Sequence, residues 1–211
     1  MKRIVWIFIL LFACFGCRGA ESKAEIAMED YEGHIGAPQL CVTANGKTMS
    51  VELTDRAYGA TVQPADLDGD GTDEFVTMSW VGGTGGYGWY LLGVYRIRDG
   101  ELVKLQDGED MYVPVETEMA LGRVVVKVPA TGYTKVMETV DPVMYEEWDC
   151  PSMNLDSFCT FEPAPEKGAG VWRGRQFMWC FSHASRAGDL MTYWKWIGGR
   201  FVLIDAEIVE S

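Results

Sequence analysis

Pairs of turn-forming residues divide this 211-residue sequence into short segments rich in β-branched and aromatic residues. Asn45-Gly46, Asp99-Gly100 and Gly198-Gly199 each separate two such segments. Asn-Gly and Asp-Gly in this position favour two-residue hairpins with type I′ turns, because both central residues take positive φ. No segment after residue 37 keeps a helical period over ten residues. The sequence therefore predicts a mainly β domain of short antiparallel strands and hairpins, arranged as a sandwich or a partial propeller.

An acidic loop that contains glycines, within 65–76, predicts a metal site. A hard cation such as Ca²⁺ takes six to eight oxygen ligands, which one loop can supply from alternate side chains, a backbone carbonyl and a further acid. Five positions have this spacing: Asp66, Asp68, Asp70, the carbonyl of Thr72, and Glu74. Gly71 permits the sharp backbone reversal that would wrap the loop around the ion. The prediction is a bound Ca²⁺, and the alternative is an acidic turn that holds no ion.

The sequence that follows the loop separates it from an EF-hand. The position of the EF-hand's bidentate glutamate falls at Thr77, and the next segment, EFVTMSWV, favours a strand rather than a helix. A calcium loop that runs into a strand resembles the FG-GAP and VCBS type of repeat, with its pattern Asp-x-Asp/Asn-Gly-Asp-Gly-x-x-Asp/Glu. The resemblance covers about 62–105 and occurs once. It implies a calcium loop within β structure, which in that family is usually a propeller blade.

The first 16 residues predict an export signal. Lys2 and Arg3 precede an apolar run, Ile4–Gly16, that is short for a membrane-spanning helix. The run ends in LFACFGC, and a cysteine after a small residue at this point resembles a bacterial lipoprotein signal. In that family the cysteine is lipidated and becomes the new N-terminus. Cys17 is the predicted lipid site, and Cys14 is the alternative.

The lipoprotein resemblance implies a protein of the cell envelope that is held at a membrane by its lipid. Arg18 follows the predicted lipid site, and a residue other than Asp there resembles outer-membrane sorting in that family. A plain secretory signal cut near Ala20 is the alternative. In either case the mature chain is exported.

Residues 17–37 are polar and acidic and predict a tether between the anchor and the domain, with a short helix near Ala24–Tyr31 as one option. Residues 38–211 then form the β domain. When Gly100 is aligned with Gly199, aromatic and aliphatic residues of the two flanking hairpins coincide at an offset of 99 residues. This predicts two pseudo-repeats, about 38–108 and 109–211, and the alternative is two unrelated hairpins.

Four cysteines lie beyond the signal, and disulfides persist outside the cytoplasm. Cys150 and Cys159 enclose a short loop and are the favoured pair, which leaves Cys41 and Cys180 for a second pair. Buried free thiols are the alternative. The segment that carries Cys150 and Cys159, MYEEWDCPSMNLDSFCTFEPAPEKG, predicts an irregular excursion because it contains three prolines.

Charge and glycine patterns argue against nucleic acid and nucleotides. The net charge of −13 does not suit phosphate binding, which needs clustered Lys and Arg. Gly83–Gly88 matches Gly-x-Gly-x-x-Gly, but a strand-like segment follows where a dinucleotide site needs a helix N-terminus. The stretch Gly82–Tyr90 therefore predicts a flexible loop. Its aromatic residues could contact a protein or glycan partner, although aromatic residues in strands more often pack in a core.

Catalytic patterns are weak. His183 lies beside Ser182 and Ser185, but the nucleophile elbow Gly-x-Ser-x-Gly does not occur. Glu146, Glu147 and Asp149 could form an acid pair only if the fold set them across a cleft. The prediction is a non-enzymatic envelope lipoprotein whose calcium-stabilised β domain serves as a binding or structural module. The alternative is an exported hydrolase that uses calcium structurally, with its acids within Glu146–Asp149 or a nucleophile near His183.

Overall fold

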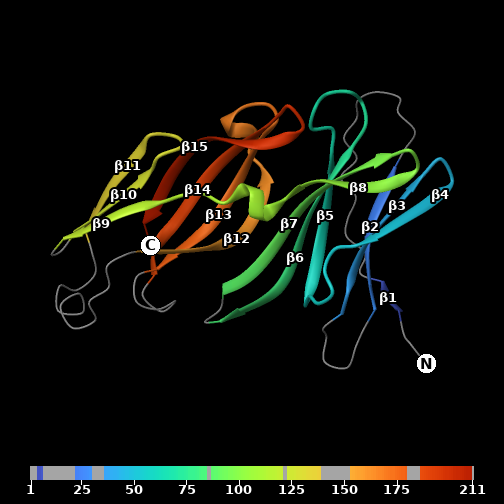
Figure 1. The fold of residues 1–211 in the computed structure, drawn as a ribbon, viewed down its shortest axis with the longest axis horizontal. Helices are drawn as coiled ribbons and strands as arrows, with labels where there is room; N and C mark the ends of the chain where they lie inside the picture. Colours follow the sequence, from blue (N-terminus) through green and yellow to red (C-terminus); the bar gives the residue numbers. More distant parts are fainter. Residues whose placement is uncertain are drawn as a thin grey trace. The chain divides into compact units, whose positions relative to one another are not determined.

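The fold is mainly β in every part of the chain that the structure describes. This computed structural model describes residues 4–6, 22–29, 36–84, 87–120, 123–138, 153–179 and 186–210. Their only helices are two short 3-10 turns, η1 (Gly108–Met111) and η2 (Pro165–Lys167), and the strands form four antiparallel sheets (Figure 1). None of the helices in these ranges is long and apolar enough to cross a membrane. The predicted fold class is confirmed.

The chain divides into two compact units, with the main division between Asp110 and Met111. The first unit holds the first eight strands and the second unit the remaining seven, apart from short exchanges at 83–89 and 198–200. The division falls close to the boundary expected for the two pseudo-repeats. A common origin of the repeats stays a prediction.

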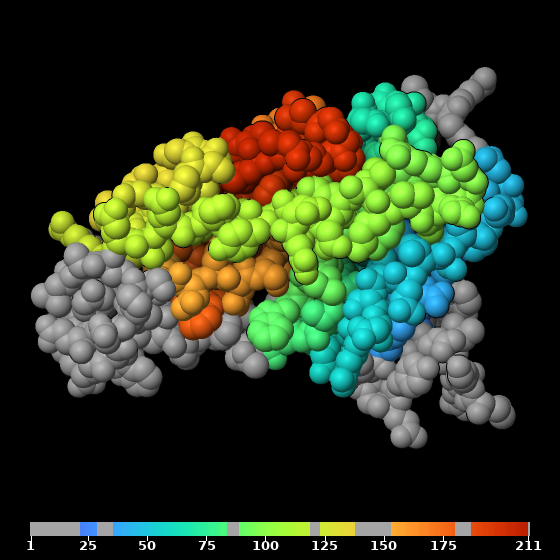
Figure 2. All heavy atoms as spheres, in the orientation of Figure 1, coloured from blue at the N-terminus to red at the C-terminus, as the bar shows by residue number. Residues whose placement is uncertain are grey.

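The first unit contains two four-stranded sheets with sequential strand order. One sheet consists of β1 (Ile4–Trp6), β2 (Lys23–Glu29), β3 (Pro38–Ala44) and β4 (Lys47–Glu52). The other consists of β5 (Gly59–Ala65), β6 (Glu74–Thr84), β7 (Tyr87–Arg98) and β8 (Glu101–Asp107). Strand β8 has exposed residues along its length and can be followed on the molecular surface in Figure 2 (light green).

The two sheets of the first unit share one hydrophobic core. Its buried members come from both sheets: Ile26, Leu40, Val42, Phe75 and Tyr95. Side chains alternate across a strand, so Leu40 and Val42 of β3 point to the same face and meet Phe75 at the start of β6. This core fixes β6 and β7 beneath the acidic loop that joins β5 to β6.

The second unit contains a three-stranded and a four-stranded sheet. The three-stranded sheet has β10 (Arg123–Val128) between β9 (Glu116–Ala120) and β11 (Tyr133–Glu138). The four-stranded sheet runs in order through β12 (Asn154–Pro163), β13 (Val171–Trp179), β14 (Arg186–Ile197) and β15 (Arg200–Glu210). The hydroxyl of Tyr133 accepts a 3.0 Å hydrogen bond from the amide of Ile208, which ties β11 to β15.

Aromatic rings dominate the core of the four-stranded sheet. Phe201 lies at the centre, with ring centroids 5.1 Å from Phe161, 5.6 Å from Trp172 and 5.1 Å from Trp196. Phe158 adds contacts to Phe161 at 5.5 Å and to Trp194 at 5.9 Å. All five of these pairs are edge-to-face, a geometry that the ring quadrupoles favour.

The three predicted hairpin turns are confirmed. Asn45 and Asp99 have φ of 52°, and the glycines that follow them also have positive φ, as type I′ turns require. Gly198 and Gly199 both have positive φ as well. A two-residue turn of this kind sets the register of its strands, so local sequence determines the pairing of β3 with β4 and of β7 with β8.

Three local expectations were wrong. Residues 23–29, expected to be part of a tether with a possible helix, form β2, because Ile26 can enter the core while the residue on either side stays less buried. The glycine-rich stretch expected as a loop is largely strand: β6 runs to Thr84 and β7 starts at Tyr87. Residues 154–163, expected to be irregular, form β12, whose register shifts around Phe158 and so accommodates a poorly alternating sequence.

The two four-stranded meanders β5–β8 and β12–β15 each contain a threonine hydroxyl that is hydrogen-bonded to a glycine carbonyl of a neighbouring strand. In the first, the hydroxyl of Thr77 donates to the carbonyl of Gly93 across two strands at 3.2 Å. In the second, the hydroxyl of Thr192 donates to the carbonyl of Gly174 at 3.3 Å. Both glycines leave room for neighbours, since a Cβ would lie 2.8 Å from the Tyr95 ring at position 93 and 2.3 Å from the Phe158 ring at position 174.

Candidate metal site

The acidic loop folds through hydrogen bonds from its backbone to its own carboxylates. Asp66 accepts from the amides of Gly69 at 2.8 Å and Gly71 at 3.0 Å. Asp68 accepts from the amide of Asp70 at 3.2 Å, and Asp70 accepts from the amide of Thr72 at 2.8 Å. Gly69 and Gly71 have φ of 79° and 83°, the left-handed conformation that glycine adopts without strain. The loop therefore curls back so that its acids face inward.

Glu74 joins the loop to the sheet. It is the first residue of β6 and is completely buried. One carboxylate oxygen, Oε2, accepts a 2.8 Å hydrogen bond from the amide of Leu67, seven residues earlier. A buried carboxylate is costly unless it is paired, so this position needs a positive charge nearby.

Arg96 of β7 supplies a positive charge. Its Nη2 lies 2.6 Å from Oδ2 of Asp68 and 3.1 Å from Oδ2 of Asp70, and it also contacts Oε1 of Glu74. The Arg96 side chain is 16% exposed, so solvent weakens these ion pairs less than it would at an open surface. The guanidinium thus forms ion pairs with three of the five predicted calcium ligands.

The pKa values of Glu74 and Asp68 shift in opposite directions in this site. Burial raises the pKa of Glu74, and the charges of Asp68 and Asp70 add to the rise, while the Leu67 amide and Arg96 oppose it. Burial also acts against ionisation of Asp68, but the hydrogen bond from Arg96, with the Asp70 amide, outweighs it and lowers the pKa of Asp68. The site therefore contains one strongly anionic acid and one that is held closer to its neutral form.

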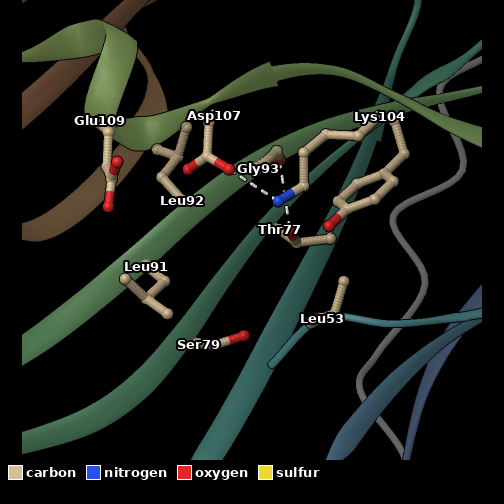
Figure 3. Close-up of a pocket in the computed structure, with 10 residues that line it drawn as sticks. Leu53, Thr77, Ser79, Leu91, Leu92, Gly93, Lys104, Asp107 and Glu109 are labelled. Atoms are coloured by element: carbon tan, nitrogen blue, oxygen red, sulfur yellow. Dashed lines mark hydrogen bonds and ion pairs between the residues drawn. The ribbon is translucent and has the colours of Figure 1, made fainter. Parts of the chain in front are cut away.

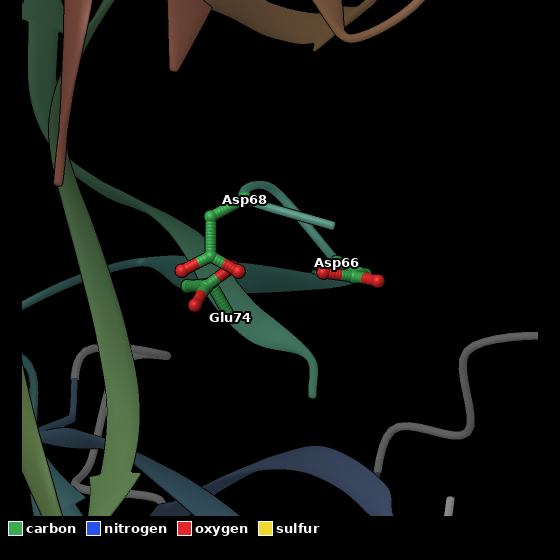
Figure 4. Close-up of side chains that lie close together, drawn as sticks. All are labelled: Asp66, Asp68 and Glu74. Carbon is green, nitrogen blue, oxygen red and sulfur yellow. The ribbon is translucent and has the colours of Figure 1, made fainter. Parts of the chain in front are cut away.

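The structure brings most of the predicted ligands together. Carboxylate oxygens of Asp66, Asp68 and Glu74 lie within 4.8 Å of one another (Figure 4). Two oxygens on opposite sides of a calcium ion are about 5 Å apart, so this spacing suits a single ion. Asp70 faces Arg96, and Thr72 contributes its amide to the loop. A calcium ion here, and the Thr72 carbonyl as its ligand, stay predictions.

Sequence reasoning missed Arg96. It lies 22 residues beyond Glu74 on the neighbouring strand of the sheet, and no local pattern links it to the loop. The only available signal was a lone pair of basic residues, Arg96 and Arg98, that alternate on an otherwise apolar strand.

The structure describes two of the four cysteines for which disulfides are predicted. Cys41 on β3 and Cys159 on β12 are thiols in this structure, and burial raises the pKa of both. The Cys159 thiol lies 3.1 Å from the carbonyl oxygen of Arg175. Cys150 and Cys180, their expected partners, lie outside the described residues, as does Cys17. Both disulfides and the lipid site stay predictions.

The remaining candidate residues are the acids within 146–149, His183 and the stretch Gly82–Tyr90. His183 and the acids Glu146, Glu147 and Asp149 lie outside the described ranges. Within Gly82–Tyr90, Trp89 is 51% exposed, so its side chain reaches solvent. A partner that contacts this segment stays a prediction.

No protein-family model, curated protein or solved structure matches this chain.

Proposed function

We propose that this chain is an exported envelope lipoprotein whose first β unit binds Ca²⁺ at the Asp66–Glu74 loop and acts as a non-enzymatic binding or structural module. The observation that carries the proposal is the inward convergence of carboxylates from Asp66, Asp68 and Glu74. The lipid anchor at Cys17 and the envelope location rest on the signal sequence alone.

Charge balance supports a metal in addition to Arg96. Four carboxylates, from Asp66, Asp68, Asp70 and Glu74, carry −4 when ionised, and one guanidinium leaves −3. Among the described residues, Asp66 forms no ion pair. A divalent cation would remove most of the remaining repulsion, and loops of this ligand number in extracellular modules bind calcium at about 10⁻⁴–10⁻³ M.

Calcium should raise the thermal stability of the protein. A ligand that binds only the folded state adds about 2.7 kcal/mol at a hundred times its Kd, which for a chain of this size corresponds to roughly 5–10 °C in Tm. The measurement is thermal unfolding in EDTA and in about 10 mM Ca²⁺, which is a hundred times the tighter end of that Kd range. Asp66→Asn should strongly reduce the calcium-dependent rise, because it removes one negative charge from the ligand set without touching Arg96.

Asp99→Asn is the matched control. It makes the same change of charge in a hairpin turn at φ of 52°, a conformation that asparagine tolerates well. It should keep the full calcium response. If the unmodified chain has the same Tm in EDTA and in calcium, the loop does not bind calcium and is an acidic turn that pairs with Arg96.

Calcium affinity should weaken as the pH falls, and the decline should begin at a higher pH than for an ordinary glutamate. Glu74 must be ionised to bind the metal, and its pKa is raised from 4.5. Without calcium, Glu74 affects stability in the opposite direction. Its pKa is higher in the folded state than in the unfolded state, so it stabilises the fold at pH values below the unfolded-state pKa. This contribution is lost as the pH rises through the folded-state pKa. The gain from calcium should therefore be largest near neutral pH.

Calorimetric titration with Ca²⁺ across this pH range measures the effect. Glu74→Gln should bind calcium more weakly and with a flatter pH dependence, because the group that titrates has been removed. A wild-type affinity that stays constant down to pH 4.5 would exclude Glu74 as a calcium ligand.

A further inference from the structure

A second concave site lies on the β5–β8 sheet of the first unit, separate from the acidic loop. It has a volume of about 120 Å³ and is lined by residues of β6, β7 and β8, by η1, and by the segment after β4 (Figure 3). For comparison, a cavity of about 150 Å³ in another protein holds benzene. The pocket is smaller than that cavity, so it has room for one edge of a ring or for the end of a chain.

The floor of the pocket carries a serine hydroxyl that faces the pocket. Ser79 is only 2% exposed, and it makes no hydrogen bond to any residue that the structure describes. Its neighbour Thr77 is satisfied, because it donates to the carbonyl of Gly93. The Ser79 hydroxyl can therefore both donate to and accept from a ligand that enters the pocket.

Gly93 lets two lining side chains pack closely against β7. A Cβ at position 93 would lie 2.8 Å from the Tyr95 ring and 3.2 Å from the Thr77 hydroxyl. The glycine thus gives the Tyr95 ring its place at the edge of the pocket, and Figure 3 shows Thr77 and Ser79 along the same strand.

One wall carries a pair of opposite charges. Lys104 Nζ donates to Oδ2 of Asp107 at 2.8 Å and lies 5.7 Å from the centre of the Tyr95 ring. An ammonium group has three donors, and an ionised carboxylate has several acceptor sites, so each can serve a ligand as well as its partner. The remaining wall is apolar and includes Leu53, Leu91 and Leu92.

We propose that this pocket binds a neutral polyol, specifically adjacent hydroxyls of a sugar ring. A sugar hydroxyl both donates and accepts, which suits a site that offers a donor in Lys104, an acceptor in Asp107 and both in Ser79. The apolar wall suits the C–H face of the ring. A small anion would meet Asp107 and Glu109, and a small cation would meet Lys104, so both fit less well.

The test is NMR titration of the full chain with methyl glycosides of glucose, galactose and mannose, with N-acetylglucosamine, and with short oligosaccharides of the same sugars. At least one sugar should shift the amide signals of Thr77, Ser79 and Gly93 in a saturable way, with millimolar affinity. Tighter binding of the oligosaccharide would assign the site to a glycan end, and equal binding would assign it to a free sugar. Acetate and methylammonium serve as charged probes of similar size.

Ser79→Ala should weaken sugar binding at least tenfold and leave Tm unchanged or slightly higher, since the hydroxyl has no partner to lose. Ser50→Ala on exposed β4 is the matched control and should bind as the unmodified chain does. Lys104→Gln should also weaken binding. The proposal is overturned if no sugar shifts these signals, if acetate or methylammonium binds as tightly as the best sugar, or if the Ser79→Ala protein binds that sugar with unchanged affinity. The sugar titrations are run both in EDTA and in calcium, so that the result for sugar binding does not depend on whether the acidic loop binds a metal.

Discussion

Replacing Arg96 with glutamine should make the stability of the first unit depend on calcium. The substitution leaves the completely buried Glu74 without its cation and removes the partner of Asp68 and Asp70. Breaking a buried ion pair typically costs 3–5 kcal/mol. Because Asp68 and Asp70 are 35% and 49% exposed, we expect the lower end, about 3 kcal/mol, when calcium is removed.

Calcium should bind the Arg96→Gln protein more tightly than the unmodified chain. In the unmodified chain the ion must displace the guanidinium or share its carboxylates, and this competition weakens the observed affinity. Removing it should strengthen binding about tenfold, which corresponds to roughly 1.4 kcal/mol. Urea unfolding in EDTA and in calcium measures the stability, and calorimetric titration measures the affinity.

Two variants separate the role of Arg96 from its charge. Arg98→Gln makes the same change of net charge at the exposed end of β7 and should alter neither quantity. Arg96→Lys keeps the charge but not the planar fork, and should recover only part of the calcium-free stability. If Arg96→Gln binds calcium no more tightly than the unmodified chain, the ion lies elsewhere or does not bind.

The parts of the fold that follow from local sequence were predictable. Asn45-Gly46 and Asp99-Gly100 determine their own turns, because few other residue pairs adopt two successive positive φ angles. The acidic loop is equally local: the glycines at 69 and 71 and the alternate aspartates fold it through hydrogen bonds that span two to five residues.

The parts that depend on distant partners were not predictable. Residues 23–29 read as a polar segment because only Ile26 is strongly buried, and β2 forms because β3 offers it a pairing edge. The pairing of Arg96 with the loop depends on the placement of β7 in the sheet. Ser79 gave no signal at all, since a serine in a strand looks ordinary until its surroundings are known.

The acidic loop and the sheet are coupled through Glu74, which belongs to both. Its side chain is hydrogen-bonded to the loop at Leu67, and the next residue, Phe75, packs in the core between the two sheets. A change at the loop can therefore reach the core through one residue. This coupling explains why we expect a local change at Arg96 to alter the stability of the whole unit rather than only the order of the loop.

Replacing Phe201 with alanine should destabilise the second unit by about 3–5 kcal/mol, the usual cost of a large cavity in an aromatic core. Phe201 is 3% exposed, and its ring contacts Phe161, Trp172 and Trp196 at centroid distances of 5.1–5.6 Å. These three rings come from β12, β13 and β14, so one deletion loosens all the strands of the sheet. Urea unfolding followed by tryptophan fluorescence measures the loss.

Ile204→Ala on the same strand is the control for this prediction. Ile204 is 43% exposed, and its truncation should cost no more than about 0.5 kcal/mol. The near-ultraviolet circular dichroism of the Phe201→Ala protein should also weaken, because Trp172 and Trp196 lose the ring that fixes their mutual orientation. If Phe201→Ala were as stable as Ile204→Ala, the aromatic cluster would not be the core of this sheet, and the stability of the sheet would have to come from its strand pairing alone.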